Sequence, residues 1–299
     1  TCHSGTHALE IIAGYYANQS VIEPSRVLIP SLTFAATANA FMRAGWEVHF
    51  IDTDRYGVLD PRTIPEEVSF HAVVAVGLYG AGIQHLDDSR RWPRSSLTNN
   101  HIYIEDAAQH WLADNCQRTS HASAISFDPM KNLACYGNGG AVVTNDLNLV
   151  EYARAWREHG KSNHAYIGTN SRMSEIECAQ MLVKTKHLDA WQERRKAIAQ
   201  YWMTRLKNSP IRSLIDSRNV DRHCFHKFVI DVDNRDVLAR NLAIKGIETK
   251  VHYNQPLHEL AAYVHYNAPD ILSVASSLSR RVLSLPIYPE LTDLEVEYI

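Results

Sequence analysis

The chain has 299 residues, of which 45% are hydrophobic and 21% are charged, and its formal net charge at pH 7 is -3. This composition excludes a disordered, collagen-like or disulfide-scaffold protein, and a chain of this length buries about 75% of its unfolded surface on folding. The small negative charge argues against a basic face for nucleic acid or an anionic membrane. Apolar runs such as 72–76 are far shorter than a membrane span. We therefore expect neither a nucleic acid nor a membrane as a partner.

Cysteine spacing predicts a reducing compartment and no metal centre. The five cysteines are widely spaced, form no CxxC pair and show no zinc-like spacing with the sixteen scattered histidines. We expect free thiols and a cytoplasmic location. The sequence starts at Thr1 rather than at methionine and stops inside a helix-like pattern at 292–299, which indicates either a trimmed chain or an incomplete sequence.

The first two-thirds of the chain alternates strand and helix patterns. Strands are predicted at 26–30, 46–52, 71–78, 101–105, 122–127 and 141–144, and helices at 8–16 and 33–44. The continuous apolar run at 71–78 is typical of a strand that is buried on both faces of a parallel sheet. The alternation predicts an α/β fold in which helices cover a mostly parallel sheet.

The last third of the chain predicts a second, smaller unit. A long helix is predicted over 173–206, which contains no proline or glycine. After it come a strand at 223–232, a helix at 235–245, a strand at 248–253 and a helix at 269–282. We place the boundary near residue 206. The large domain then spans 1–206 with the long connecting helix, and a small C-terminal α/β domain spans 207–299.

Lys131 is the first candidate catalytic residue. It lies in the segment SFDPMKN (126–132), directly after a predicted strand and shortly before a glycine-rich turn and another strand. A lysine between two buried strands is partly desolvated, which lowers its pKa and allows the neutral amine to form a Schiff base. The alternative is a surface lysine beside a glycine turn.

Asp106 and Gln109 lie where an open α/β sheet binds its ligands. Asp106 follows a predicted buried strand in the segment IEDAAQ (104–109), and the carboxyl ends of such strands form the ligand crevice. A buried carboxylate needs a cationic partner, which a protonated pyridine nitrogen supplies. Gln109 would lie near the same edge and could hydrogen-bond a ring oxygen. Alternatively, Asp106 is the N-cap of a short helix.

Three further segments have both a functional and a plain structural interpretation. Ser-Gly-Thr at 4–6 precedes a predicted helix, whose free N–H groups attract phosphate, although any capped helix can begin this way. Phe34 follows a strand and could stack on a heteroaromatic ring or belong to the core. Asn170, before the long helix, is a possible anion ligand or a helix cap.

These elements together supply the parts of a pyridoxal 5'-phosphate (PLP) site: a Schiff-base lysine, a pyridinium carboxylate, a phosphate cradle and a stacking ring. The sequence contains no GxxxxGK[ST], strand-linked GxGxxG, HExxH or GxSxG motif.

The sequence resembles the DegT/DnrJ/StrS family of PLP-dependent nucleotide-sugar aminotransferases, which have the aspartate aminotransferase (type I) fold. The matching segments run in family order along the whole chain: SGTHAL (4–9), PSLTFAATANA (30–40), IEDAAQ (104–109), SFDPMKNL (126–133), GNGGAVVTND (137–146), GTNSRMSEIECA (168–179), FHKFVI (225–230), VHYNQPLH (251–258) and SLPIYPELTD (284–293). The lysine segment and the Glu-Asp-Ala-Ala-Gln segment are the specific ones.

The resemblance implies a role for each candidate residue. Lys131 holds PLP as a Schiff base and afterwards moves the proton between the substrate carbon and the cofactor. Asp106 keeps the pyridine nitrogen protonated, Gln109 contacts the ring hydroxyl and Phe34 stacks on the ring. The remaining cofactor contacts are phosphate ligands from Gly5, Thr6 and Ser126, with Asn170 reaching the cofactor phosphate of a neighbouring subunit in a homodimer whose active sites lie at the interface. His252 and Tyr253 are expected to lie near the substrate.

Some positions depart from the family pattern. Asn138 stands where an acidic residue is usual, Asp128 and Met130 vary the lysine loop, and the segment that precedes Ser-Gly-Thr in the family is absent from this sequence. That absence puts part of the substrate and dimer surface in doubt. Family members that act as sugar dehydratases have histidine in place of the lysine, so Lys131 favours transamination.

The leading prediction is transfer of an amino group from glutamate or glutamine to a nucleotide-linked keto-sugar. One alternative keeps the cofactor and replaces the substrate by a cyclitol or another non-nucleotide keto compound. Another alternative is a weakly catalytic, PLP-binding regulatory dimer. Retention of both Lys131 and Asp106 argues against the second alternative, because binding alone needs no electron sink.

Overall fold

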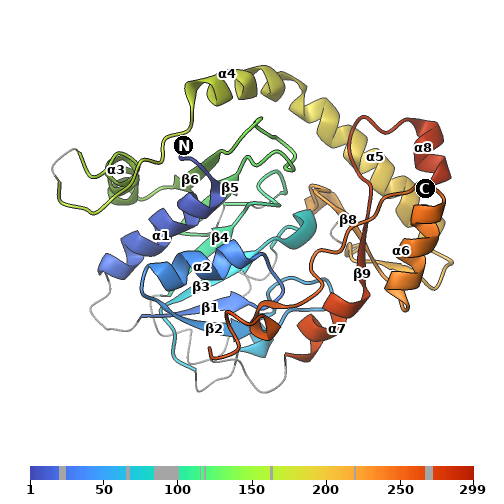
Figure 1. Cartoon of the computed structure of the whole chain (residues 1–299), viewed down its shortest axis with the longest axis horizontal. Coiled ribbons are helices and arrows are strands. Elements are labelled where there is room, and N and C mark those ends of the chain that lie inside the picture. The colour runs from blue at the N-terminus through green and yellow to red at the C-terminus, as the bar shows by residue number, and fades with distance from the viewer. Residues whose placement is uncertain are drawn as a thin grey trace.

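The fold is described from a computed structural model of the whole chain (Figure 1). The residues described are all except 20–24, 65–67, 84–100, 115, 118, 162–163, 219 and 267–271. Within the described residues, no helix has both the length and the apolar character needed to cross a membrane.

A mostly parallel six-stranded sheet forms the larger part of the molecule, as the sequence predicts. Its order is β2-β1-β3-β4-β5-β6, and only β6 runs antiparallel to its neighbour. The strands are β1 (Arg26–Pro30), β2 (Glu47–Ile51), β3 (Ala72–Val76), β4 (Ile102–Asp106), β5 (Ala122–Ser126) and β6 (Gly140–Thr144).

Both faces of this sheet are buried because successive side chains of a strand point to opposite sides. On β3, Val74 and Val76 join a core cluster with α1 and α2, while Val73 and Ala75 join a different cluster on the other face. This explains why the strand reads as a continuous apolar run without polar alternation.

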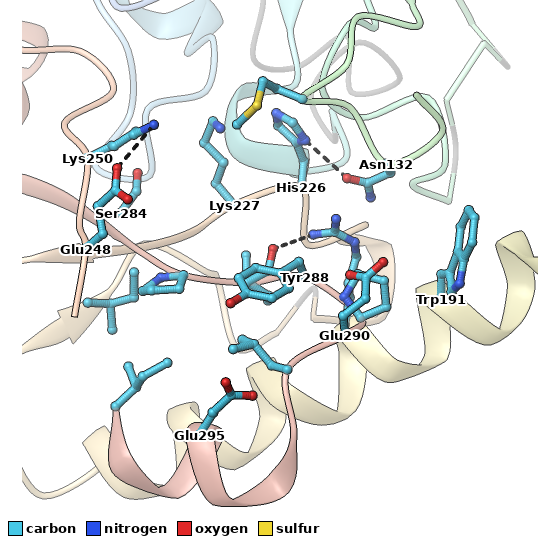
Figure 2. Close-up of a pocket in the computed structure, with 18 of the residues that line it drawn as sticks. Asn132, Trp191, His226, Lys227, Glu248, Lys250, Ser284, Tyr288, Glu290 and Glu295 are labelled. Atoms are coloured by element: carbon cyan, nitrogen blue, oxygen red, sulfur yellow. Dashed lines mark hydrogen bonds and ion pairs between the residues drawn. The ribbon is translucent and has the colours of Figure 1, made fainter. Parts of the chain in front are cut away.

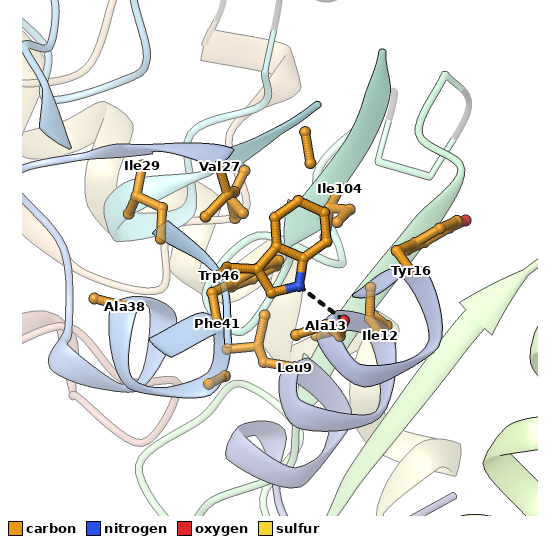
Figure 3. Close-up of a cluster of buried hydrophobic side chains, with 14 of the residues drawn as sticks. Leu9, Ile12, Ala13, Tyr16, Val27, Ile29, Ala38, Phe41, Trp46 and Ile104 are labelled. Atoms are coloured by element: carbon orange, nitrogen blue, oxygen red, sulfur yellow. Dashed lines mark hydrogen bonds between the residues drawn. The ribbon is translucent and has the colours of Figure 1, made fainter. Parts of the chain in front are cut away.

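Three helices pack near the sheet: α1 (Gly5–Gln19), α2 (Ala35–Arg43) and α3 (Leu147–Trp156). The apolar positions of α1 recur at helical spacing and are buried, for example Leu9, Ile12 and Tyr16. Trp46 joins α1 to α2, because its ring packs edge-on against Phe41 and its Nε1 donates to the Ala13 carbonyl at 2.9 Å (Figure 3). The analysis of the sequence missed α3, whose N-cap Asp146 accepts the Asn148 N–H at 2.9 Å.

The long helix predicted at 173–206 is divided. It consists of α4 (Glu175–Lys184), a 3-10 turn η5 (Thr185–His187) and α5 (Leu188–Leu206), which run from the larger sheet toward the smaller one (Figure 1). The hydroxyl of Thr185 bonds back to the Leu182 carbonyl at 2.9 Å, a local bond that competes with regular helix geometry.

A second, antiparallel sheet follows, in the order β7-β8-β9. Its strands are β7 (Arg212–Ser213), β8 (Phe228–Asp231) and β9 (Val282–Leu285), with helices α6 (Arg235–Ile244), α7 (Ser273–Arg281) and α8 (Asp293–Tyr298). Further 3-10 turns are η1 (Pro61–Thr63), η2 (Leu78–Gly80), η6 (Val220–Arg222) and η7 (Leu257–Glu259).

The predicted strand at 248–253 is wrong. This segment makes a single bridge, between Lys250 and Ser284, and the partner of β8 is β9 instead. The residues of β9 are more apolar and almost wholly buried, so they take the place beside β8. The first residues of the helix predicted at 269–282 lie outside the described residues, and the described part is α7.

The two sheets pack together through shared apolar contacts. Leu32, Leu78 and Tyr79 from the first part of the chain cluster with Val229 and Leu278 from the last part. In addition, Asp52 at the end of β2 accepts the Val274 and Ala275 N–H groups at the start of α7, at 3.0 and 2.8 Å. The division of the chain near residue 206 stays a prediction.

Candidate active site

The carboxyl edge of the large sheet brings together the predicted site residues. Asp106 is the last residue of β4 and Ser126 the last of β5, and these two strands pair in parallel. Both side chains are buried. Parallel strands end at one common edge, so residues that are 20 positions apart in the sequence become neighbours here.

Asp106 is a buried carboxylate whose partners are neutral. It accepts the Thr37 hydroxyl at 2.7 Å and the Ala108 N–H at 3.1 Å. Burial raises its pKa, while these two hydrogen bonds and the charge of Lys131 lower it. Among the described residues no cationic side chain lies within ion-pair distance of Asp106, so a protonated ring nitrogen would supply the missing partner. The Ala108 bond also shows that the aspartate caps the turn that follows, while its role toward a cofactor stays a prediction.

Lys131 is half-buried in a loop that is closed by hydrogen bonds, and the alternative of a surface lysine is wrong. Phe127 N–H bonds to Gly139 at 2.8 Å, and the Lys131 N–H bonds to Asp128 at 2.9 Å. Burial lowers the pKa of the Lys131 ammonium group, opposed by Asp106 and Asp128. A lowered pKa increases the fraction of neutral, nucleophilic amine.

The start of α1 forms a possible phosphate cradle. Gly5 opens the helix, so the helix itself supplies no acceptor for the N–H groups of Gly5 and Thr6. A β-carbon added to Gly5 would lie 2.7 Å from the Ser126 β-carbon, so only glycine fits this close approach. The segment is fixed by a pair of backbone hydrogen bonds between Cys2 and Gly140, at 2.8 and 2.9 Å.

Phe34, Gln109 and Tyr253 lie together at the same edge. Phe34 is 56% exposed, which excludes a core position for it, and its ring centroid lies 6.0 Å from that of Tyr253. The Gln109 amide nitrogen donates to the Tyr253 hydroxyl at 3.3 Å, and its amide oxygen accepts the Tyr79 N–H at 2.8 Å. An exposed phenylalanine ring beside the polar groups of Gln109 and Tyr253 is suited to stacking on a flat ring.

Two further residues at this edge, Thr37 and Tyr79, were not predicted from the sequence. Thr37 lies one helical turn after Phe34, so the spacing could have placed its hydroxyl near Asp106 and the proposed cofactor ring. Tyr79 is buried at a positive φ of 63°, and its hydroxyl donates to the His252 carbonyl. No local pattern marks Tyr79, because both of its partners come from distant parts of the chain.

His252 and Tyr253 face different neighbours although they are adjacent in the sequence. The His252 ring bonds to the Ser284 hydroxyl at 2.8 Å, and burial together with Lys227 and Lys250 lowers the pKa of His252 to about 4. His252 lines a cavity of about 750 Å³, shown in Figure 2, whose wall also includes Lys131. Tyr253 lies instead with Phe34 and Gln109.

Asn170 is exposed, and the described residues show no contact between it and Lys131 or Asp106. The next residue, Ser171, is buried and accepts the His3 N–H at 3.3 Å, and its hydroxyl pairs with the His7 ring at 2.7 Å. These bonds hold the loop with Asn170 beside the first turn of α1.

The whole chain, residues 1–299, matches the model of the DegT/DnrJ/EryC1/StrS aminotransferase family. The chain belongs to this family. It is 34% identical to the erythromycin biosynthesis sensory transduction protein EryC1 of Saccharopolyspora erythraea, over all of this chain and 83% of that protein. It is 33% identical to the dTDP-3-amino-3,4,6-trideoxy-alpha-D-glucose transaminase of Streptomyces venezuelae, over 95% of this chain and 79% of that one.

The solved structures agree with this assignment. S. venezuelae DesV in complex with a ketimine intermediate matches with a TM-score of 0.89 and 32% identity, over 99% of this chain and 81% of that one. The predicted family and type I fold are thereby confirmed, and this DegT/DnrJ/EryC1/StrS protein is an aminotransferase.

Proposed function

We propose that this aminotransferase uses PLP to move an amino group from L-glutamate or glutamine to a keto-sugar that is carried on a nucleotide. The observation that carries the proposal is the pair formed by buried Asp106 and half-buried Lys131, each of which shifts the pKa of the other at one sheet edge. The similarity to a dTDP-sugar transaminase supports the class of acceptor.

The residues at the edge fit this cofactor. When bound, PLP supplies an aldehyde for the amino group and a ring that accepts an electron pair. Lys131 would hold the cofactor through Nζ and, once released, would carry the proton to and from the substrate carbon. Asp106 would keep a proton on the ring nitrogen, with its carboxylate oriented by Thr37. Gly5, Thr6 and Ser126 would bind the phosphate, Gln109 would contact the ring hydroxyl and Phe34 would cover the ring face.

We also propose a homodimer whose active sites lie at the interface. Asn170 is exposed beside the first turn of α1, where its amide is free to reach the cofactor phosphate of a second subunit. Helix α4, close by in the chain, exposes Ile176, Leu182 and Val183, and a patch of this kind is typical of a protein–protein contact. His252 on the cavity wall and Tyr253 beside Gln109 are proposed substrate contacts. The cytoplasmic location likewise stays a prediction.

The absorbance spectrum of the PLP-loaded protein tests the function. We expect a visible band that disappears when L-glutamate is added, because the cofactor becomes aminated, and that returns when a nucleotide keto-sugar accepts the amino group. A panel of dTDP- and UDP-linked keto-sugars with mass detection identifies the acceptor. A spectrum that no amino donor changes would refute catalysis.

One relative favours a second candidate function. EryC1 carries the name of a sensory transduction protein. A weakly catalytic, PLP-binding regulatory dimer would bind the cofactor and leave its visible band unchanged by L-glutamate. A third arrangement, in which the acceptor is a cyclitol, keeps the response to glutamate and fails with every nucleotide sugar of the panel.

A further inference from the structure

The cavity beside Lys131 is separate from the proposed cofactor contacts. Its wall comes from the lysine loop, α5, the segment 246–252 and the chain that follows β9. Of the proposed cofactor ligands only Lys131 lines it, and the phosphate cradle at Gly5 and Ser126 does not. The cavity therefore lies on another side of the reactive amine, where a substrate could reach it.

Cationic side chains outnumber carboxylates on this wall. The lining residues include five cations and three glutamates: Lys131, Lys184, Arg195, Lys227 and Lys250 against Glu248, Glu290 and Glu295. A concave site with an excess of one charge concentrates ligands of the opposite charge.

Two cations on this wall, Lys131 and Lys227, have no partner among the described residues. The Lys227 ammonium group has no hydrogen bond or ion pair among the described residues, and Figure 2 shows it pointing to the same side as the ammonium group of Lys250. Lys250 is 3.4 Å from Glu248, but the two side chains are 57% and 81% exposed, and such surface pairs are weak. Both lysines can therefore bind another anion.

Arg195 is a cation of this cavity that has a structural role. It is buried and donates to the Ile287 carbonyl at 2.7 Å and to the Phe225 carbonyl at 3.4 Å, so it ties two chain segments together. The Lys227 side chain, by contrast, makes no such hydrogen bond to another segment among the described residues. Its charge contributes no contact to the fold and is better explained by a ligand.

The electrostatics agree with the geometry. Burial, Lys131, Arg195 and Lys250 lower the pKa of Lys227 to about 8, opposed by Asp128. The neighbouring His226 and His252 also have lowered pKa values, with Lys227 and Lys131 among the causes in both. These cations destabilise one another, and a bound anion would relieve that repulsion.

We propose that Lys227 and Lys250 form a subsite that binds an oxyanion of a substrate, a carboxylate or a phosphate, beside the Lys131 amine. This proposal rests on the proposed function, because in transamination both substrates would bring an oxyanion close to Lys131. The amino donor has carboxylates, and the acceptor has the diphosphate of its nucleotide.

Binding of unreactive probes to the PLP-loaded protein tests this subsite. The affinities are measured by isothermal titration calorimetry. Glutarate is the probe for the carboxylates of the donor, and dTDP or UDP is the probe for the diphosphate of the acceptor. The variants are Lys227→Met, Lys250→Met and the double variant, with Lys227→Arg to retain the charge. Lys207→Met is the matched control, because Lys207 is exposed and lies outside this cavity.

We expect the double variant to bind one probe at least about tenfold more weakly, Lys227→Arg to bind nearly normally and the control to be unchanged. Weaker glutarate binding assigns the subsite to the donor, and weaker nucleotide binding assigns it to the acceptor. At pH 8 the protein should also take up protons when the anion binds, measured in buffers of different ionisation enthalpy, because the bound anion raises the pKa of Lys227.

Two results would overturn the subsite. One is a wild-type protein that binds neither probe, and the other is a double variant whose affinities for both stay within twofold of wild type. Neither result depends on turnover, so an absent response to L-glutamate refutes the proposed function separately.

Discussion

The two sides of Lys131 are built on different principles. On the cofactor side, Asp106 and Gln109 are buried, and each side chain makes two hydrogen bonds. Those of Asp106 are with Thr37 and Ala108, and those of Gln109 are with Tyr79 and Tyr253. On the cavity side, Lys227 and Lys250 extend from the smaller sheet and its neighbouring segment without a strong partner. The first arrangement is rigid before any ligand arrives, whereas the second is completed only by a ligand.

This difference matches the chemistry that each side would perform. A cofactor stays bound through every cycle, so fixed donors orient it at no further entropic cost. Substrates must enter and leave, and cations without a strong partner attract their anionic groups without holding them permanently. Four substitutions test whether the two sides are as different as this comparison states.

Lys131→Ala should have the largest effect. Loss of the amine removes the cofactor linkage and the proton carrier together, so the half-reaction with L-glutamate should slow by about 10³-fold or more. Single-turnover absorbance measures it, with Lys207→Ala as the control at an exposed lysine. Retained turnover would remove the catalytic assignment.

Asp106→Asn should come next. An amide cannot hold the ring nitrogen protonated, and an unbalanced buried partner costs about 3–4 kcal/mol, which corresponds to a rate reduced by about 10²- to 10³-fold. The same half-reaction is measured after PLP has been bound. Asp231→Asn is the control, because Asp231 is also buried but pairs with Arg212 at 2.9 Å in the smaller sheet. An equal loss of rate in both variants would contradict the role of Asp106.

Thr37→Val should act through Asp106. It removes the 2.7 Å hydrogen bond that lowers the pKa of the Asp106 carboxyl, and the rate should decrease about tenfold. The substitution Thr33→Val, four residues earlier and just before α2, removes only a hydroxyl that is 3.2 Å from the Thr37 hydroxyl, and should have a smaller effect. The reverse order would mean that Thr37 has only a packing role.

Lys227→Met should have the smallest effect, on stability, and should be favourable. The folded state lowers the pKa of Lys227 from 10.5 to about 8, so the charged amine destabilises the fold below pH 8, and this cost disappears as the pH rises through 10.5. The free energy of unfolding of the variant should therefore be about 1 kcal/mol higher than that of the wild type at pH 7. Urea unfolding at pH 7 and pH 10.5 measures the difference, which should shrink at the higher pH. A destabilised variant at pH 7 would show that Lys227 supports the fold.

Much of the fold was readable from the sequence because its signals are local. The strands at 26–30 and 122–127 and the helix at 235–245 needed only apolar patterns and turn residues. The predicted strand at 248–253 failed because its segment makes one isolated bridge, from Lys250 to Ser284 of β9, whereas β9 pairs with β8 along its whole length. The interrupted helix at 173–206 failed because one threonine hydroxyl formed a local bond that periodicity does not show.

The sequence by itself determined which residue types stand at the ends of the strands. Lys131, Asp106 and Gly5 follow or precede regular elements, and their position relative to those elements fixes the edge at which they meet. Only the tertiary structure decided which cations lack partners, that Tyr79 joins Gln109 to His252, and that a cavity opens beside Lys131. The reason is physical: burial and pairing depend on contacts between residues that lie 30 to 173 positions apart in these cases, and no local pattern encodes them.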